Sequence, residues 1–518
     1  MRTFFSGWIL EKAGHLIPAV KAYYAALVHF PRSFCWSEHH DFVWYIAQAA
    51  VERIELILRD YPQLRWDLVD ASVTIEHGYD PDVSDDVIMV NPGRFVKTPI
   101  ANKIQGLTDL SRLKIIQTRG KGKVTLVQFE NGHWQLRVNG QPFFVRGITY
   151  TPTEIGYGPD TDASFFNRWM FSDKNHNGKI DAAYDAWVDT NRNDQQDADE
   201  PAVGDFQLLK EMGVNTIRFF IPVSGKTVYK PELINKPLLR DLYERFGIRV
   251  IPVDLVGAYT VGSGAEWDKG TDYTDPKQRA TMKELVRAEV MDLKDEPFVL
   301  MWLLGNENNM PLEYTGINAT RTNAASHPKA YAQFLNEVAK MIHRLDPDHP
   351  VGVGNAELAL VDSYRQYSPA LDFIGINSYR GQNGFGSLWA QVKKLFDRPV
   401  LITEYGCDAY FTGKGEDEAM QEAYHEGNFR DILYEQAGGP YTGNSIGGLI
   451  FEYLDEWWKD TESGSWSTQE TRPSFPFPFE DGYDQEEWLG IVGQGSGQNS
   501  PFERQPRRAY QYYKDHTF

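Results

Sequence analysis

Two glutamates stand at the ends of short apolar runs. Glu307 follows the run 298–304 and the pair Gly305-Asn306, and Glu404 follows the run 399–402 with Thr403 between them. Runs of this length predict strands that are buried on both faces. In parallel α/β enzymes, the chemistry is carried by polar side chains at the carboxyl ends of such strands. A facing pair of carboxyl groups, one protonated and one ionised, is what cleavage of a glycosidic bond requires.

Strand and helix patterns alternate from about residue 133 to the end of the chain. Strands are expected at 144–149, 216–220, 250–254, 299–304, 351–354, 373–377, 400–403 and 446–451. Helices are expected at 205–212, 236–246, 276–294, 329–345, 357–367, 388–396 and 417–435. Eight alternations predict an α/β fold, a (β/α)8 TIM barrel, with Glu307 after the fourth strand and Glu404 at the end of the seventh. A doubly wound open sheet is the alternative, and the lack of a glycine-rich turn after the first strand counts against it.

The first 132 residues predict two smaller units before the barrel domain at 133–518. Residues 1–70 form a helical segment, because apolar residues recur at three- and four-residue spacing in 16–29 and 41–60. The stretch 18–27, followed by Phe30-Pro31, resembles the second half of a tetratricopeptide (TPR) repeat, so these helices are expected either to pack on a neighbouring unit or to bind a protein partner. Residues 71–132 predict a small β region, and Asn139-Gly140 predicts a hairpin just after it.

Composition limits the classes of partner. The 518 residues include 52 basic and 72 acidic side chains, a net charge of −20, which argues against nucleic acid. No apolar run approaches the ~20 residues of a membrane-spanning helix. Cys35 and Cys407 are the only cysteines, so no disulfide framework is expected. The first residues do not read as a signal peptide, which predicts either a cytoplasmic protein or a processed or truncated form of an exported one.

Four ordered motifs carry a family resemblance. They are Arg146-Gly147-Ile148, the strand 213–218, the strand from Trp302 to Glu307, and the segment 402–406. Together they resemble the retaining glycoside hydrolases of clan A, with the family 2 barrel as the most similar type. The segments 373–379 and 403–407 are also similar to fungal cell-wall β-1,3-glucanosyltransferases. The resemblance implies a carbohydrate substrate.

The resemblance also implies roles at the site. Glu307 would be the acid/base, Glu404 the nucleophile, and Asn306 the partner of the sugar 2-hydroxyl. From their places at the ends of the second and sixth strands, Arg218 and Tyr379 are expected to hydrogen-bond Glu404. An aromatic side chain after the eighth strand commonly forms the floor for the sugar, although this strand ends in Phe451-Glu452-Tyr453 where family 2 often has tryptophan. The aromatic candidates are Trp457, Trp458, Tyr150, Tyr259 and Trp267.

These features predict a retaining β-glycoside hydrolase or transglycosylase acting on a β-linked oligo- or polysaccharide. A β-glucan is suggested by the fungal-like segments, whereas family 2 members act on galactosides, mannosides and glucuronides. The acidic net charge weakly disfavours a uronic acid. A non-catalytic glycan-binding or scaffold protein is the alternative from another class. A metal-dependent hydrolase would need histidine ligands at the strand ends, and the sequence has none there.

A long insertion at 153–203, between the first strand and the first helix, predicts a structural calcium site. Its first half places Asp173, Asn175, Asn177, Lys179 and Asp181 at positions 1, 3, 5, 7 and 9 of a loop with Gly178 at position 6. Its second half places Asp189, Asn191, Asn193 and Glu200 at positions 1, 3, 5 and 12, with Asp194 where glycine is expected. Both halves resemble EF-hand and dockerin calcium loops. An acidic, solvated loop is the alternative, and no organic cofactor is expected.

Overall fold

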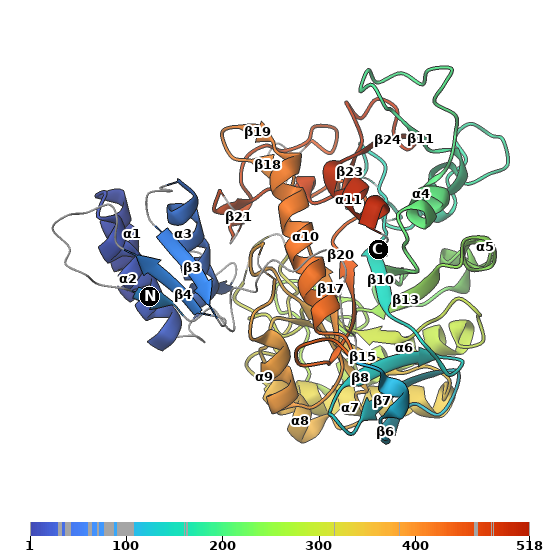
Figure 1. Cartoon of the computed structure of the whole chain (residues 1–518). Coiled ribbons are helices and arrows are strands. Elements are labelled where there is room, and N and C mark those ends of the chain that lie inside the picture. The colour runs from blue at the N-terminus through green and yellow to red at the C-terminus, as the bar shows by residue number, and fades with distance from the viewer. Residues whose placement is uncertain are drawn as a thin grey trace.

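Eight parallel strands close into a barrel in the order β10-β12-β13-β14-β15-β16-β17-β20 in the computed structural model (Figure 1). The structure describes residues 2–29, 34–36, 43–60, 65–69, 72–76, 88–90, 108–159, 161, 164–314, 316, 318–382, 384–459, 465–477, 479 and 481–516. The strands are β10 Val145–Thr149, β12 Thr216–Phe220, β13 Arg249–Asp254, β14 Trp302–Leu304, β15 Val351–Ala356, β16 Phe373–Asn377, β17 Val400–Tyr405 and β20 Ser445–Ile450. Strand β10 pairs in parallel with both β12 and β20, which closes the barrel. The predicted TIM barrel is confirmed.

Helices follow the strands and cover the outside of the barrel (Figure 1). They are α4 Asp205–Glu211, α5 Lys236–Phe246, α6 Pro276–Leu293, α7 Pro328–Leu345, α8 Val361–Tyr367, α9 Leu388–Leu395, α10 Glu418–Tyr434 and α11 Arg508–His516. Helix α5 shows why helix boundaries could be predicted from the sequence. The Asn235 side chain caps its start by accepting from the Leu238 amide, and Gly247 ends it with φ 76°. The helix predicted at 357–367 begins only at Val361, so its predicted start at Glu357 was wrong. No helix was predicted at the position of α11.

A four-stranded antiparallel sheet closes the amino end of the barrel. It consists of β6 Ile115–Arg119, β7 Val124–Phe129, β8 Trp134–Val138 and β9 Gln141–Pro142. The amides of Val124 and Trp134 donate to the carbonyls of Asp348 and Gly443, which lie just before β15 and β20. The opposite end, where Glu307 and Glu404 lie, is therefore the open mouth.

The predicted hairpin lies within this sheet. Asn139 and Gly140 form its turn at φ 50° and 79°, as an Asn-Gly hairpin requires. Because β8 pairs with β7, the sheet runs across the boundary predicted at residue 132.

Three helices at the start of the chain, α1 Arg2–Lys12, α2 Leu16–His29 and α3 Ile46–Asp60, share a hydrophobic cluster of their own. Helix α2 has the predicted bounds, whereas the helix predicted from residue 41 begins at Ile46, after β2 Val43–Tyr45. Phe30-Pro31 and residues 77–87 and 91–107 of the predicted β region lie outside the described residues. The TPR likeness and the protein partner stay predictions.

The insertion at 153–203 packs against the C-terminal segment beside the barrel mouth. Its strand β11 Trp187–Val188 pairs with β24 Glu503–Pro506, which also pairs with β23 Val492–Gly493. Arg504 of β24 forms a fully buried ion pair with Asp205 of α4, with Nε–Oδ1 and Nη2–Oδ2 distances of 2.7 and 2.9 Å. The insertion and the chain end are thus fixed to the first helix of the barrel.

No helix of the described residues has both the length and the apolar character that crossing a membrane needs.

Candidate active site

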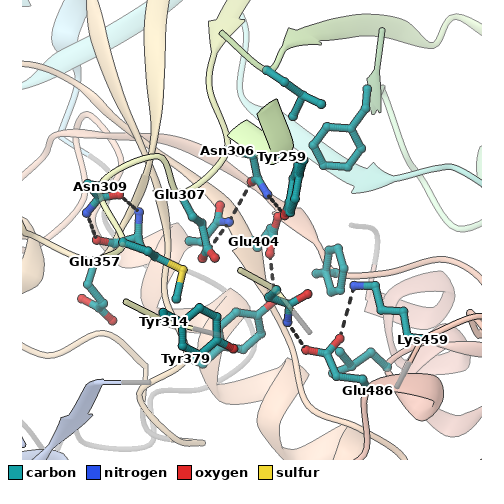
Figure 2. Close-up of a pocket in the computed structure, with 18 of the residues that line it drawn as sticks. Tyr259, Asn306, Glu307, Asn309, Tyr314, Glu357, Tyr379, Glu404, Lys459 and Glu486 are labelled. Carbon is teal, nitrogen blue, oxygen red and sulfur yellow. Dashed lines mark hydrogen bonds and ion pairs between the residues drawn. The ribbon is translucent and has the colours of Figure 1, made fainter. Parts of the chain in front are cut away.

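A cavity of about 1220 Å³ opens at the carboxyl ends of the barrel strands. Residues at or after the ends of all eight strands line it: Thr151, Pro222, Leu255, Asn306, Ala356, Asn377, Glu404 and Phe451. Its volume exceeds the ~300–1,000 Å³ of an ordinary small-molecule pocket, so it has room for more than one sugar ring. Glu307 and Glu404 both lie on its wall (Figure 2).

The Glu404 carboxylate accepts hydrogen bonds from two side chains. Arg218, at zero side-chain exposure, donates through Nη1 to Oε1 of Glu404 at 2.7 Å. The Tyr379 hydroxyl donates to Oε2 at 3.2 Å. Both hydrogen bonds were predicted from the sequence. Because β12, β17 and the segment just after β16 supply the three side chains, the carboxylate is fixed by the barrel framework and points into the cavity.

Glu307 lies on a turn that follows β14. Gly305 and Glu307 have φ of 78° and 56°, a conformation that is costly for a glutamate and that is often found at functional sites. The Asn308 side chain stabilises this turn, accepting from the Asn306 amide at 2.8 Å and donating to the Tyr273 hydroxyl at 2.8 Å. The turn therefore directs the Glu307 carboxyl toward the cavity.

The protonation of Glu307 is set by its surroundings. Burial, and then the negative charge of Glu404, raise the pKa of Glu307 to about 8, with a smaller contribution from Glu486. The amide of Asn377 donates to its Oε1 at 3.1 Å and opposes this rise. Glu307 is therefore protonated at neutral pH, whereas Glu404 faces an arginine.

Asn306 connects the two glutamates. Its Oδ1 accepts from Arg218 Nη2 at 2.7 Å and from Asn377 Nδ2 at 3.1 Å, and its Nδ2 lies 3.4 Å from the Tyr259 hydroxyl (Figure 2). Since the amide oxygen already has two donors, the amide nitrogen is the group that Asn306 presents toward the cavity. Asn377, the last residue of β16, was missed in the sequence, although a polar residue ending a buried strand was the signal.

Some of the aromatic side chains predicted to contact the sugar line the cavity, and others do not. Trp458 lines the cavity and packs edge-on against Phe165 and Phe166. Trp457 is 6% exposed and does not line it. Tyr150 is fully buried and its hydroxyl donates to Asp205 at 3.0 Å, so its predicted contact with substrate is contradicted. The lining does include Tyr259 and Trp267.

The cavity wall also includes Phe451, Lys459 and Glu486, none of which was predicted as a site residue. Phe451 follows β20, and the ammonium of Lys459 lies 5.0 Å from its ring centre. Lys459 donates to Glu486 at 3.2 Å. The eighth-strand position was a signal for Phe451, but the loop carrying Lys459 and Glu486 has no periodic pattern that would place them.

The first predicted calcium loop folds with its side-chain oxygens turned inward. Asp173 accepts from the amides of Asn177 and Gly178, both at 3.0 Å. A π-turn at Asp181–Asp185 adds one residue relative to an α-helical turn, so Asp185 takes the place expected for position 12. Its Oδ2 accepts from Asn177 Nδ2 at 2.7 Å. Asp181 instead accepts from Ser172 and the Lys174 amide.

The second loop begins with the same arrangement. Asp189 accepts from the Asn193 amide at 3.2 Å, as Asp173 does in the first loop. Asp197, at position 9, accepts from Asn191 Nδ2 at 2.7 Å and Asn193 Nδ2 at 3.0 Å, and it was missed in the sequence. Asp194 adopts φ 57°, which explains how a residue other than glycine occupies position 6. The two loops begin alike, but the carboxylate beside the asparagines comes from position 13 in the first and position 9 in the second. Glu200, the predicted position-12 residue, instead accepts from the Thr190 amide at 2.7 Å. Both loops offer oxygen atoms of the kind that calcium prefers.

Residues 191–431 match the family model described as "Glycosyl hydrolases family 2, TIM barrel domain". The matched range contains both Glu307 and Glu404. Over these residues the chain is therefore similar to the barrel domain of that glycoside hydrolase family. The resemblance predicted from the sequence motifs is confirmed over this range, and the match supports the predicted glycoside hydrolase class.

Individual relatives of this chain are distant in sequence. A β-glucuronidase of Streptococcus agalactiae serotype V is 26% identical over 271 residues, covering 48% of this chain and 40% of that protein. Mannan endo-1,4-β-mannosidase 4 of Solanum lycopersicum is 22% identical over 398 residues, covering 69% of this chain and 90% of that protein. This chain therefore spans less than half of the first relative's length and most of the second's.

Among solved structures, a β-D-glucuronidase of Dictyoglomus thermophilum aligns with a TM-score of 0.42 at 16% identity. The alignment covers 88% of this chain and 68% of that one.

Proposed function

We propose that this chain is a retaining β-glycosidase that works by double displacement, with Glu307 as acid/base and Glu404 as nucleophile. The observation that carries the proposal is the pair of opposite environments in one cavity. Arg218 and Tyr379 donate to Glu404, whereas burial and the charge of Glu404 raise the pKa of Glu307 to about 8. One ionised and one protonated carboxyl group are what the first step of a retaining mechanism needs.

In the first step, Glu307 donates its proton to the glycosidic oxygen while a Glu404 oxygen attacks the anomeric carbon. The glycosidic bond breaks, the leaving alcohol departs neutral, and an ester joins the sugar to Glu404. Arg218 and Tyr379 orient the attacking carboxylate. Asn306 presents its amide toward the sugar, where a hydrogen bond to the 2-hydroxyl would strengthen in the transition state.

The second step uses the change of charge that the first step makes. Once Glu404 is an ester, the charge that helped raise the pKa of Glu307 is gone, so its pKa falls and the carboxylate acts as a base. It takes a proton from water, whose oxygen attacks the anomeric carbon and releases Glu404. A sugar hydroxyl in place of water gives transglycosylation by the same route.

The substrate class we propose is a β-linked oligo- or polysaccharide. The cavity volume of about 1220 Å³ supports a chain of sugars over a single ring. Glucans, galactans and mannans are the candidates, and a β-glucan is the one that the fungal-like segments favour.

A panel of β-linked oligosaccharides tests this proposal. Proton NMR of the first-formed sugar is expected to show the β anomer, and product sizes will show whether hydrolysis or transfer dominates. An α anomer as the first product would contradict double displacement, and no cleavage of any β-linkage would favour a glycan-binding role.

The pH dependence of catalysis follows from the proton on Glu307. Its folded pKa is raised to about 8, so the acid form that the first step needs is present below pH 8 and is lost above it. We expect kcat/KM to fall tenfold per pH unit on the alkaline side of a limb near pH 8, measured with a glycoside whose leaving group requires protonation. A limb near 4.5, the ordinary value for glutamate, would contradict the assignment.

We also propose that the two loops of the insertion bind calcium as a structural ion. Asp173, Asn175 and Asn177, joined by Asp185, would hold the first ion, and Asp189, Asn191 and Asn193, joined by Asp197, the second. The carboxylate oxygens of Asp189, Asp194 and Glu503 lie within 4.8 Å of one another, so an ion there would also bind β24. The ion would fix the insertion beside the cavity and would take no part in the reaction.

Thermal unfolding of chelator-treated protein tests this role. Added calcium is expected to raise the unfolding midpoint by at least about 2 °C at saturation, since ligand that binds only the folded state stabilises it. Magnesium should give less, and Asp173→Ala with Asp189→Ala should remove the effect. Asp199→Ala, an exposed acid of the same loop, is the matched control. A midpoint that calcium leaves unchanged would contradict the site.

A further inference from the structure

Three charged residues of the segment after β20 meet on the wall of the cavity. Lys459 Nζ lies 3.2 Å from Glu486 Oε2 (Figure 2). It also lies 3.5 Å from Glu456 Oε2. Their side chains are at most 10% exposed, and all three residues line the cavity. Asn318 donates to the other oxygen of Glu486 and fixes its orientation. We call Lys459, Glu456 and Glu486 the Lys459 trio.

The ammonium of Lys459 is charged but already balanced. Burial by itself would lower the pKa of Lys459, and the charges of Glu486 and Glu456 outweigh this and raise it well above its ordinary value. Burial also raises the pKa of Glu456, so Glu486 is the first partner of the ammonium and Glu456 the second. The trio as a unit therefore offers no net positive charge to a ligand.

The other buried cations of the described cavity wall are balanced in the same way. Arg380 donates through Nε and Nη2 to Glu357, at distances of 3.1 and 2.6 Å, and Arg218 behind the wall donates to Glu404. Lys226 is exposed at the outer rim, where it donates to Thr260 and where water screens its charge. Every buried cation of the described lining thus faces a carboxylate.

A uronic acid would bring its own carboxylate into this site. In a buried cavity an unpaired anion loses its hydration, and here it would also approach Glu404, Glu486 and Glu357. A neutral sugar differs, because its hydroxyl groups can donate to Glu486 and accept from Lys459 without adding charge. The site therefore favours binding of sugars that carry hydroxyl groups and disfavours binding of sugars that carry a carboxylate.

We propose that the Lys459 trio makes this site selective for β-glycosides of neutral sugars over the corresponding β-uronides. The inference rests on the proposed glycosidase function and names its substrate class. Lys459 and Glu486 are specificity-determining residues in this account, since they would meet the sugar hydroxyls directly.

Matched 4-nitrophenyl substrates test the selectivity of the full chain. The pairs are β-D-glucoside with β-D-glucuronide, and β-D-galactoside with β-D-galacturonide, with the β-D-mannoside added to cover the third neutral sugar. We expect the best neutral substrate to exceed both uronides by about 100-fold or more in kcat/KM, the scale at which a site without a partner for a charged group rejects it. A uronide turned over as well as its neutral counterpart would overturn the inference while leaving the glycosidase function intact. Failure of all five substrates, together with no cleavage of any member of the β-linked oligosaccharide panel, would contradict the proposed function itself.

The double variant Glu456→Gln/Glu486→Gln tests the residues. It leaves the Lys459 ammonium without carboxylate partners, so the ratio of uronide to neutral turnover is expected to rise at least about tenfold. Glu470→Gln is the matched control, because Glu470 lies in the same C-terminal segment and pairs with Arg472. An unchanged ratio in a folded double variant would overturn the role of the trio.

A binding measurement on the wild type covers the case in which the double variant does not fold. The 1,5-lactone of the preferred neutral sugar is expected to inhibit cleavage of that sugar's glycoside at a concentration at least about tenfold lower than the aldarolactone of the same configuration does. Equal or stronger inhibition by the aldarolactone would overturn the inference without recourse to a variant.

Discussion

Glu404→Gln is expected to lower kcat by roughly 10^4- to 10^6-fold, the scale seen when an enzyme loses its nucleophile or the base that activates it. The amide has nearly the shape of the carboxylate but cannot attack the anomeric carbon, so no glycosyl ester forms. Arg218 then keeps one neutral acceptor in place of its ionic partner. KM should change far less than kcat, because the sugar contacts of the cavity remain.

A matched control separates this loss from a general disturbance of the cavity. Glu357→Gln changes another glutamate of the same wall, which pairs with Arg380 and lies outside the network of Glu404. Its loss is expected to stay below about 100-fold. Chemical rescue adds the stereochemical proof: with Glu404→Gly, azide should occupy the vacated side and attack the β-glycoside directly, giving the α-glycosyl azide. A β-azide from this variant would assign the nucleophile elsewhere.

Glu307→Gln is expected to cost about 10^2- to 10^4-fold on glycosides with poor leaving groups, the usual contribution of a positioned general acid. Activated 2,4-dinitrophenyl glycosides should lose much less in the first step, because their leaving group needs no proton. The alkaline limb near pH 8 should disappear with the variant, since the group whose pKa is raised to about 8 is gone. Steady-state rates across pH with both substrate classes measure these effects.

The two glutamates are expected to differ in their rescue products. Azide added to Glu307→Ala should intercept the glycosyl ester on Glu404 and give the β-glycosyl azide, the opposite anomer from the Glu404 variant. The reverse pattern would exchange the two roles. Equal losses on activated and unactivated glycosides in Glu307→Gln would show that this residue is not the proton donor.

The barrel could be predicted from the sequence because most residues of its strands are apolar and buried. Strands β12 and β16 have the bounds predicted for them, and the strand count that placed Glu307 fourth and Glu404 seventh holds in the closed barrel. The partners of Glu404 were predictable for the same reason. Arg218 lies within β12 and Tyr379 two residues after β16, so the order of the strands in the barrel decides that both side chains reach Glu404.

The rest of the site depends on long-range packing that no local pattern encodes. Trp457 and Trp458 are adjacent and alike in the sequence, yet only Trp458 lines the cavity. Tyr150 follows the first strand, as a substrate contact would, but the buried Asp205–Arg504 pair gives its hydroxyl a partner in the core. Lys459 meets Glu486 across a separation of 27 residues.

The insertion illustrates a different limit. Position 12 of its first loop is Tyr184, so the pattern lacks an acid, and only the π-turn at Asp181–Asp185 brings Asp185 to the expected place. A single added residue in a turn changes which side chain faces the loop. The sequence spacing cannot show this, because it counts residues and not turns.

Trapping of the covalent intermediate tests the central claim most directly. A 2-deoxy-2-fluoro-β-glycosyl fluoride of the preferred sugar slows both steps but keeps its good leaving group, so the glycosyl ester accumulates and can be located by peptide mass spectrometry. The account predicts one 2-fluoroglycosyl group per chain, attached to Glu404, and no label in Glu404→Gln. A label on Glu307, Glu357 or Glu486, or continued turnover with inversion and no label, would contradict the double displacement proposed here.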